Sequence, residues 1–515
     1  MDNESKKQHK RNLIFYPLGT IGRDMIYSLF TNFILLYILY TKQLTDAQLG
    51  AVTAIMIAAR IFDGINDPIM GNIIERTRTK WGKFKPWLLI GVLTTSVVVY
   101  LAFNTNLTGW TFIIFFGVIY FAYSLTYTMH DISYWGMVAA LSSDSNTRNT
   151  ITSRATLFAG IGSTLASMLV PMLTTGTNAI GGSAHTAYGR IALIICVLAP
   201  LFIMFPILGV KERRDDMATP APKVSFRKIF NTIAKNDQLV WVIVAFLLQQ
   251  IGNNFVFAGV GSTYIYFTYG YEGGLYSLFS TIGVAATAGL MVFYPALSRK
   301  FRRKKLMSYF VIVAMAGFAL ELISGLALSH SMLGFWVLTI GYMLSNLGLY
   351  SMYLIMMISI INTVEYNEYK NGERDEAIIT SMRPFLTKLG SAIVVGITSL
   401  TYMIFRITDF TNKISGYEQQ ANLGEITPEA KNQMVDGLLK GVSNGQRLGM
   451  LFAIVLIPMI FMLLSFFIYR KKYKLDEEEY VRIVLEIEKR RKAELAENAE
   501  SRAEAKAEAA ENNKA

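Results

Sequence analysis

The chain has 515 residues, of which 52% are hydrophobic and only 17% are charged. This apolar excess argues against a soluble globular protein and indicates a membrane protein with many spans. The net charge of +12 does not indicate nucleic-acid binding, because the basic residues gather in alternate loops, and the single cysteine, Cys196, excludes an intramolecular disulfide.

Apolar stretches long enough to cross a membrane recur along the chain. Twelve are predicted to be transmembrane helices, at residues 13–40, 47–75, 86–104, 109–137, 151–174, 189–210, 238–268, 275–297, 305–328, 333–362, 378–406 and 447–470. Loops such as 76–85, 211–235 and 299–305 are rich in Lys and Arg, whereas the alternate loops are nearly free of them. Basic loops stay in the cytoplasm, so both termini are predicted to be cytoplasmic.

A polar, proline-containing segment separates the first six spans from the last six. The predicted division is a cytoplasmic N-terminus at 1–12, an N-terminal half at 13–210, a cytoplasmic middle loop at 211–237, a C-terminal half at 238–470, and a charged cytoplasmic tail at 471–515. The C-terminal half includes a long outer loop of mixed charge at 408–446, which has room for short helices. The tail pattern is typical of a solvated helix, docked through Tyr480, Ile483, Val484 and Ile487.

An internal repeat supports this division. I-T-S-R-A-T-L-F-A-G-I-G-S begins at Ile151, and I-T-S-M-R-P-F-L-T-K-L-G-S begins at Ile379. At a nearly equal offset, Asp67-Pro68 with its basic loop corresponds to Tyr294-Pro295 with another basic loop. Two six-helix halves related as parallel repeats are the layout of the major facilitator fold, in which substrate binds between the halves. We therefore predict an all-α membrane protein of this fold with 12 transmembrane helices.

Two acidic residues interrupt the second predicted span. Asp63 and Asp67 are four residues apart, which places them one turn apart on one helix face. Carboxylates at membrane depth are costly and mark an ion or substrate pathway, and two that repel each other require a shared proton or a bridging cation. Asn66 and Thr128 would add neutral oxygens to a site for a hard cation such as Na⁺. Alternatively, Asp67 alone braces the cytoplasmic loop that follows.

The fourth predicted span carries a stripe that suits a sugar. Tyr127, Asp131 and Trp135 recur every four residues on one face. An aromatic ring covers the apolar face of a sugar while a carboxylate accepts from its hydroxyls. The alternative is a core aromatic stripe with a satisfied aspartate. Arg23-Asp24 in the first span is predicted to form an ion pair beside a cavity.

Cationic side chains are expected to face these acids, because an unpaired buried charge is prohibitive. Arg154 and Lys388 are the candidates; Arg154 and also Arg383 would otherwise snorkel to the cytoplasmic surface. His130 adjoins Asp131 but points about 100° away on a helix, which leaves its part in coupling open.

Four segments in this order carry a resemblance: D-G-I-N-D-P-I-M-G, W-G-K-F-K-P-W, Y-T-M-H-D-I-S-Y-W and R-P-F-L-T-K-L-G-S. The chain resembles the glycoside–pentoside–hexuronide:cation symporter family of the major facilitator superfamily, including its melibiose-permease and lactose/raffinose-permease branches, over about residues 12–474. The resemblance implies a coupling-cation site at Asp63, Asn66, Asp67 and Thr128, with Na⁺ as the candidate metal at Asp63 and Asp67. It implies a sugar site at Arg23, Asp24, Tyr127, Asp131, Trp135 and Arg154, with Lys388 near both sites and Arg383 as in the lactose-permease branch.

We therefore expect a multi-pass protein of the cell membrane that imports a glycoside, with a galactoside di- or trisaccharide favoured, by cation-coupled alternating access. Na⁺ is favoured over H⁺ or Li⁺ as the coupling ion. No cofactor, enzymatic activity or nucleic-acid partner is expected, and the chain is expected to act as a monomer that contacts sugar and membrane lipid. The alternatives are a pentoside, hexuronide or lysolipid-like substrate and, from other classes, a membrane sensor or a membrane glycosyltransferase.

Overall fold

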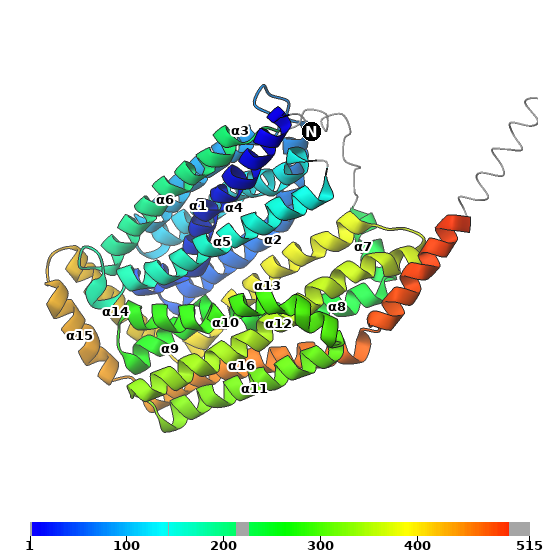
Figure 1. The fold of residues 1–515 in the computed structure, drawn as a ribbon. Helices are drawn as coiled ribbons and strands as arrows, with labels where there is room; N and C mark the ends of the chain where they lie inside the picture. The colour runs from blue at the N-terminus through cyan, green and yellow to red at the C-terminus, as the bar shows by residue number, and fades with distance from the viewer. Residues whose placement is uncertain (1–2, 143, 213–225, 494–515) are drawn as a thin grey trace, which may run out of the picture.

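The computed structural model describes residues 3–142, 144–212 and 226–493, and within these ranges the chain is almost entirely helical (Figure 1). Eleven helices of the described residues are long and apolar enough to cross a membrane. In lipid each backbone N–H and C=O must bond within the protein, and a helix satisfies nearly all of them internally. The predicted all-α membrane architecture is confirmed.

The first half consists of six long helices. They are α1 (Asn3–Thr41), α2 (Asp46–Arg76), α3 (Lys85–Phe103), α4 (Gly109–Leu141), α5 (Ser145–Thr174) and α6 (Ala184–Gly209), with the 3-10 helix η1 (Gly176–Asn178) before α6. α1 packs on α5 and α6, and α4 packs on α2 and α3. The packing of α4 on α2 brings the acid-bearing faces of these two helices together, and the ion pair of Arg23 with Asp131 joins α1 to α4.

The second half contains more and shorter pieces. They are α7 (Phe226–Lys235), α8 (Asp237–Asn254), η3 (Val256–Ala258), α9 (Val260–Tyr269), α10 (Gly273–Lys300), α11 (Arg303–Ala327), α12 (Met332–Asn371), α13 (Glu376–Ile404), α14 (Ile407–Asn422), α15 (Pro428–Lys440) and α16 (Asn444–Lys472). α12 packs on α11 and α10, whereas α8 packs on α16, α13 and α12. A further helix covers residues 477–493.

The seventh predicted span differs from the expectation of one helix over 238–268. It is built from α8 and α9 in succession, joined through η3. Gly259 breaks the path with φ +110°, a conformation that L side chains rarely adopt. The Gly259 carbonyl at this break accepts from the backbone N–H of Thr263 at 3.1 Å and also from Tyr402 Oη at 2.9 Å and Ser262 Oγ at 2.8 Å. Its hydrogen bonds are therefore made within the protein, as backbone at membrane depth requires.

The contacts between the halves follow the internal repeat. α2 packs on α13, and α5 packs on α10. The repeat relates α5 to α13 and α2 to α10, so a rotation between the halves maps one of these contacts onto the other. Hydrogen bonds join the outer ends of the halves, including Thr53 Oγ1 to Ser399 Oγ at 2.6 Å and Ser277 Oγ to the Met168 carbonyl at 2.7 Å. The molecule is therefore closed on its outer side.

The segment predicted as a long outer loop, 408–446, folds largely into α14 and α15. Lys431 of α15 and Glu418 of α14 form an ion pair of 3.1 Å with both side chains fully buried. Glu418 also accepts from the backbone N–H of Ala184, at the start of α6, at 2.6 Å. α14 packs mainly on α1 and α6, and α15 packs on η1, so these two helices of the second half cover the outer end of the first half.

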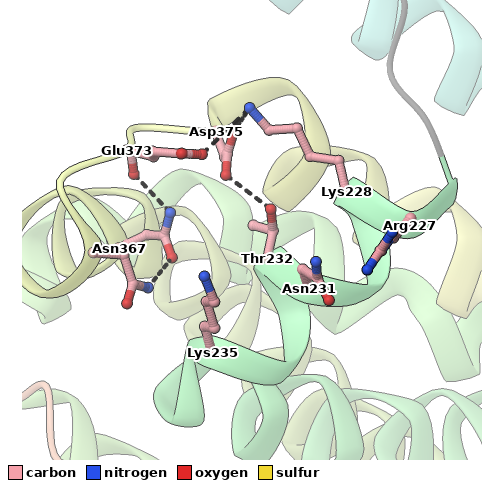
Figure 2. A pocket seen from close by; sticks show the side chains of 9 residues that line it. Arg227, Lys228, Asn231, Thr232, Lys235, Asn367, Glu373 and Asp375 are labelled. Atoms are coloured by element: carbon pink, nitrogen blue, oxygen red, sulfur yellow. Dashed lines mark hydrogen bonds and ion pairs between the residues drawn. The ribbon is translucent and has the colours of Figure 1, made fainter.

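On the cytoplasmic side, α7 is held against the connection between α12 and α13. Figure 2 shows Lys228 of α7 directed at Asp375 and Glu373, with ion pairs of 3.0 and 3.3 Å, while Thr232 donates to Asp375 at 2.8 Å. Burial raises the pKa of the Asp375 carboxyl, but the Thr232 hydroxyl and the Lys228 ammonium outweigh burial and lower that pKa overall. These residues line a pocket that lies outside the membrane spans. Its contacts join α7 to the connection between α12 and α13, so it is not the transport cavity.

Candidate transport site

The two acids of α2 face two hydroxyls of α4 in matching register. Ser124 donates to Asp63, and Thr128 donates to Asp67 at 3.1 Å. Both pairs are separated by the same number of residues along the chain, because α2 and α4 each advance one turn between their polar residues. The packing of α4 on α2 therefore repeats one carboxylate–hydroxyl contact a turn apart.

Each of these carboxylates also has a cationic neighbour. Arg60 Nη1 lies 3.7 Å from Asp63 Oδ2, and Lys388 of α13 forms an ion pair with Asp67. The Asp63 side chain is only 8% exposed, whereas that of Asp67 is 34% exposed. The adjacent Asn66 is buried, and no described residue accepts a hydrogen bond from its amide nitrogen. Asp67 is therefore the more accessible carboxylate of the pair.

A second acidic group lies where α1 meets α4. The Arg23 guanidinium bonds Asp24 Oδ2 at 2.8 Å and is paired with Asp131 across the helix interface. Arg23 is itself buried, while the Asp131 side chain remains 35% exposed. The arginine therefore holds two carboxylates together and leaves oxygen lone pairs of Asp131 free for a ligand.

Aromatic rings line the same interface. The Arg23 guanidinium carbon lies 5.0 Å from the Trp135 ring centroid, so the guanidinium and the indole ring form a cation–π contact. Tyr127 stacks on Tyr123 at 5.4 Å between centroids and tilts against Tyr27 at 5.2 Å. Flat rings beside carboxylates form a wall that accepts a polyhydroxylated ring by stacking and hydrogen bonding.

Three other candidate residues lie elsewhere. Arg154 is exposed and donates to the Leu13 carbonyl at 3.3 Å, so its described contact is with α1 backbone and not with an acid. Arg383 is also exposed and lies 3.3 Å from Tyr353 Oη. His130 is fully buried against Gly91 of α3, and neither ring nitrogen has a hydrogen-bond partner within the part of the chain that the structure describes. The predicted turn of His130 away from Asp131 agrees with this position.

The acidic and basic side chains described above form one group, which we call the charged centre. Four carboxylates, Asp24, Asp63, Asp67 and Asp131, are neighboured by three cationic groups, Arg23, Arg60 and Lys388. Lys388 also acts electrostatically on Asp131, in addition to its pairing with Asp67. When all four carboxylates are ionised, one negative charge is left over among these described residues, in a part of the protein where net charge is costly.

Comparison with known proteins places the chain in a family. The model of the family described as MFS/sugar transport protein matches residues 15–477. The chain belongs to this family. It is 28% identical to the lactose permease of Leuconostoc lactis, with 95% of this chain and 74% of the relative covered, and 28% identical to the raffinose carrier protein of Pediococcus pentosaceus, with 92% and 71% covered. The resemblance to glycoside–pentoside–hexuronide:cation symporters is confirmed, and the chain is a multi-pass membrane transporter.

Solved structures support the same fold. A bacterial homolog of the human lysosomal transporter Spinster, in an inward-facing and unoccupied conformation, superposes with a TM-score of 0.60 at 12% identity, covering 94% of this chain and 99% of that one. At this identity the similarity concerns the fold alone. The predicted major facilitator architecture is confirmed.

Two residues that contact the acids of α2 were not predicted from the sequence. Arg60 is one turn before Asp63 and was not singled out, although a cation three residues from a buried acid is a recognisable pairing. Ser124 is four residues before Thr128, just as Asp63 is four before Asp67. That shared spacing was the available signal for the contact between α2 and α4.

Proposed function

We propose that the chain is a secondary active transporter that imports a galactoside di- or trisaccharide together with Na⁺, by alternating access to the cavity between its halves. The observation that carries this proposal is the charge balance of the centre, in which three cationic groups leave one of four carboxylates uncompensated. One monovalent cation restores neutrality. Asp63 and Asp67 would hold it, with the Thr128 hydroxyl and the Asn66 side-chain oxygen as neutral ligands.

Lys388 is the residue that would couple the two ligands. Its ammonium pairs with Asp67 and also acts on Asp131. A Na⁺ ion at Asp67 would compete with Lys388 for the same oxygens, and the released ammonium would then interact more strongly with Asp131. By linkage, sugar and Na⁺ would each raise the other's affinity by the same factor.

The sugar side supports a glycoside over the other substrates. Trp135 and Tyr127 offer aromatic faces beside Asp24 and Asp131, which accept from hydroxyls. Lactose and raffinose, named in two relatives, are both galactosides. A pentoside or a hexuronide is the alternative sugar. A lysolipid-like substrate would not need an acid-rich wall, and this counts against it.

Uptake into proteoliposomes tests the proposal. Galactosides, glucosides and xylosides would be offered under a Na⁺ gradient and, separately, under a proton gradient. We expect galactoside uptake that Na⁺ stimulates, loss of this stimulation in Asp67→Asn, and loss of sugar uptake in Asp131→Asn. Asp409→Asn, at an exposed carboxylate on α14, is the matched control. Stimulation by protons alone would contradict the assigned ion, and absence of glycoside uptake under either gradient would contradict the function.

A further inference from the structure

A cavity between the two halves has no charged side chain among its described lining residues. It has a volume of about 260 Å³ and lies between α1 and α5 of the first half and α8, α10 and α12 of the second. Its described lining residues are mostly hydroxyl and amide side chains, with Phe257 and Tyr350 as aromatic members. We call this cavity the neutral chamber.

One face of α1 connects the charged centre to the neutral chamber. Asp24 of the charged centre, Ser28, and the chamber residue Asn32 recur every four residues and so lie on the same helix face. Eight residues of helix separate the two ends by about 12 Å. Ser28 Oγ meets Ser163 Oγ of α5 at 2.8 Å, so hydroxyls continue the polar face between the two sites.

The outer side of the chamber is closed by the contact of α5 with α10. Ser277 Oγ, one turn before the lining residue Ser280, donates to the Met168 carbonyl at 2.7 Å. The chamber thus lies between the charged centre and the outer closure. A ligand that extends from Asp24 and Asp131 toward the outer side would enter it.

The chemistry of the chamber is that of hydrogen-bond acceptors. Asn253 Oδ1 is buried, and none of the described residues donates a hydrogen bond to it. Ser280 and Thr287 donate their protons to carbonyls of their own helix at 3.1 and 2.6 Å, which leaves their oxygen lone pairs available to a ligand. A buried acceptor without a donor is costly, so this surface favours a ligand that brings several donors. The volume is that of a ring-sized ligand and far exceeds a bare cation.

We propose that the neutral chamber holds the second sugar unit of an oligosaccharide whose terminal unit binds at Asp24 and Asp131. The inference rests on the proposed function, because it assigns the extension of the same substrate. Hydroxyl groups of the second unit donate to the chamber oxygens, and the Phe257 ring offers it an apolar contact. The chamber therefore makes the transporter select a glycoside by chain length as well as by its terminal sugar.

Competition for uptake can distinguish binding of the terminal sugar from binding of the second sugar unit. The purified full chain in proteoliposomes would be tested with a methyl galactoside and with a disaccharide that has the same terminal galactose. Asn253→Leu and Thr281→Val remove lining polar groups on different helices at nearly constant volume, so the outcome does not depend on one variant folding. We expect the apparent affinity for the disaccharide to weaken about 10-fold, and that for the methyl galactoside to change by less than about 2-fold.

Thr398→Val is the matched control, because Thr398 is buried and polar but does not line the chamber. Equal weakening for both sugars in the lining variants would show a structural role and overturn the proposal. A shift in the Na⁺ requirement with unchanged disaccharide affinity would assign the chamber to the ion and overturn it as well. Failure of the unmodified chain to transport either glycoside would instead overturn the proposed function, before any variant is compared.

Discussion

At the level of single residues, the hydroxyls of α4 decide how the acids of α2 are held. Ser124 donates to the nearly buried Asp63, so its removal leaves a carboxylate oxygen without a partner. Ser124→Ala is therefore expected to raise the Na⁺ concentration for half-maximal stimulation of uptake about 10-fold. Ser133→Ala is the control, since that hydroxyl donates only to the Met129 carbonyl of its own helix. Equal effects of the two substitutions would show that Ser124 has no special link to the ion.

The spacing of residues predicts much of this centre but not its pairings. A separation of four in Asp63 and Asp67, and again in Tyr127, Asp131 and Trp135, follows from one helical turn. Which hydroxyl meets which acid depends on how α2 and α4 are aligned, and periodicity within one helix does not contain that register. Arg154 shows the same limit, because its flexible side chain reaches α1 backbone when an acid partner was expected.

At the level of helices, hydropathy alone does not predict the buried packing of α14 and α15. The sequence indicates a polar, charged loop there, because its apolar residues are too few for a span. The structure instead buries an ion pair, Lys431 with Glu418, under these helices. Burial raises the pKa of the Glu418 carboxyl, and the Lys431 ammonium opposes that rise. The tail helix was easier to predict, since buried Ile483 and Ile487 lie one turn apart in the expected docking face.

Removing one member of this pair should destabilise the molecule more than removing both charges. Lys431→Met leaves a buried, unpaired carboxylate at Glu418, with an expected cost of about 3–5 kcal/mol. The melting temperature of the purified protein should therefore fall, and Lys431→Met combined with Glu418→Gln should recover most of the loss, because the amide oxygen still accepts from Ala184. Lys440→Met, at an exposed site on α15, is the control. A double variant no more stable than Lys431→Met would contradict a buried pair.

For the whole molecule, the sequence predicts the two halves and which of their helices correspond. It does not predict which side of the transporter is closed. The repeat beginning at Ile151 and Ile379 places these residues on α5 and α13, which occupy equivalent places in the contacts between the halves. Repeats constrain which helices correspond. They do not specify which end of the cavity is closed, since alternating access uses the same sequence in both states.

The outer closure offers a test of alternating access in this chain. Thr53 of α2 and Ser399 of α13 come from different halves, and their hydroxyl oxygens lie 2.6 Å apart. Direct side-chain contact is the first requirement for a disulfide, so cysteines at both positions should crosslink under mild oxidation. Because the chain has one native cysteine, the buried Cys196, Cys196→Ala gives a clean background.

The crosslink should abolish sugar uptake, because the outer ends can no longer separate, while binding from the cytoplasmic side is retained. Reduction should restore uptake, and each single cysteine variant should transport normally under oxidation. Bound sugar can be measured in detergent, where both sides are accessible, and its affinity should stay within about 3-fold of the reduced protein. Full uptake by the oxidised, crosslinked protein would mean that the outer contact of α2 with α13 does not open during transport. The proposed movement of the two halves would then have to be abandoned.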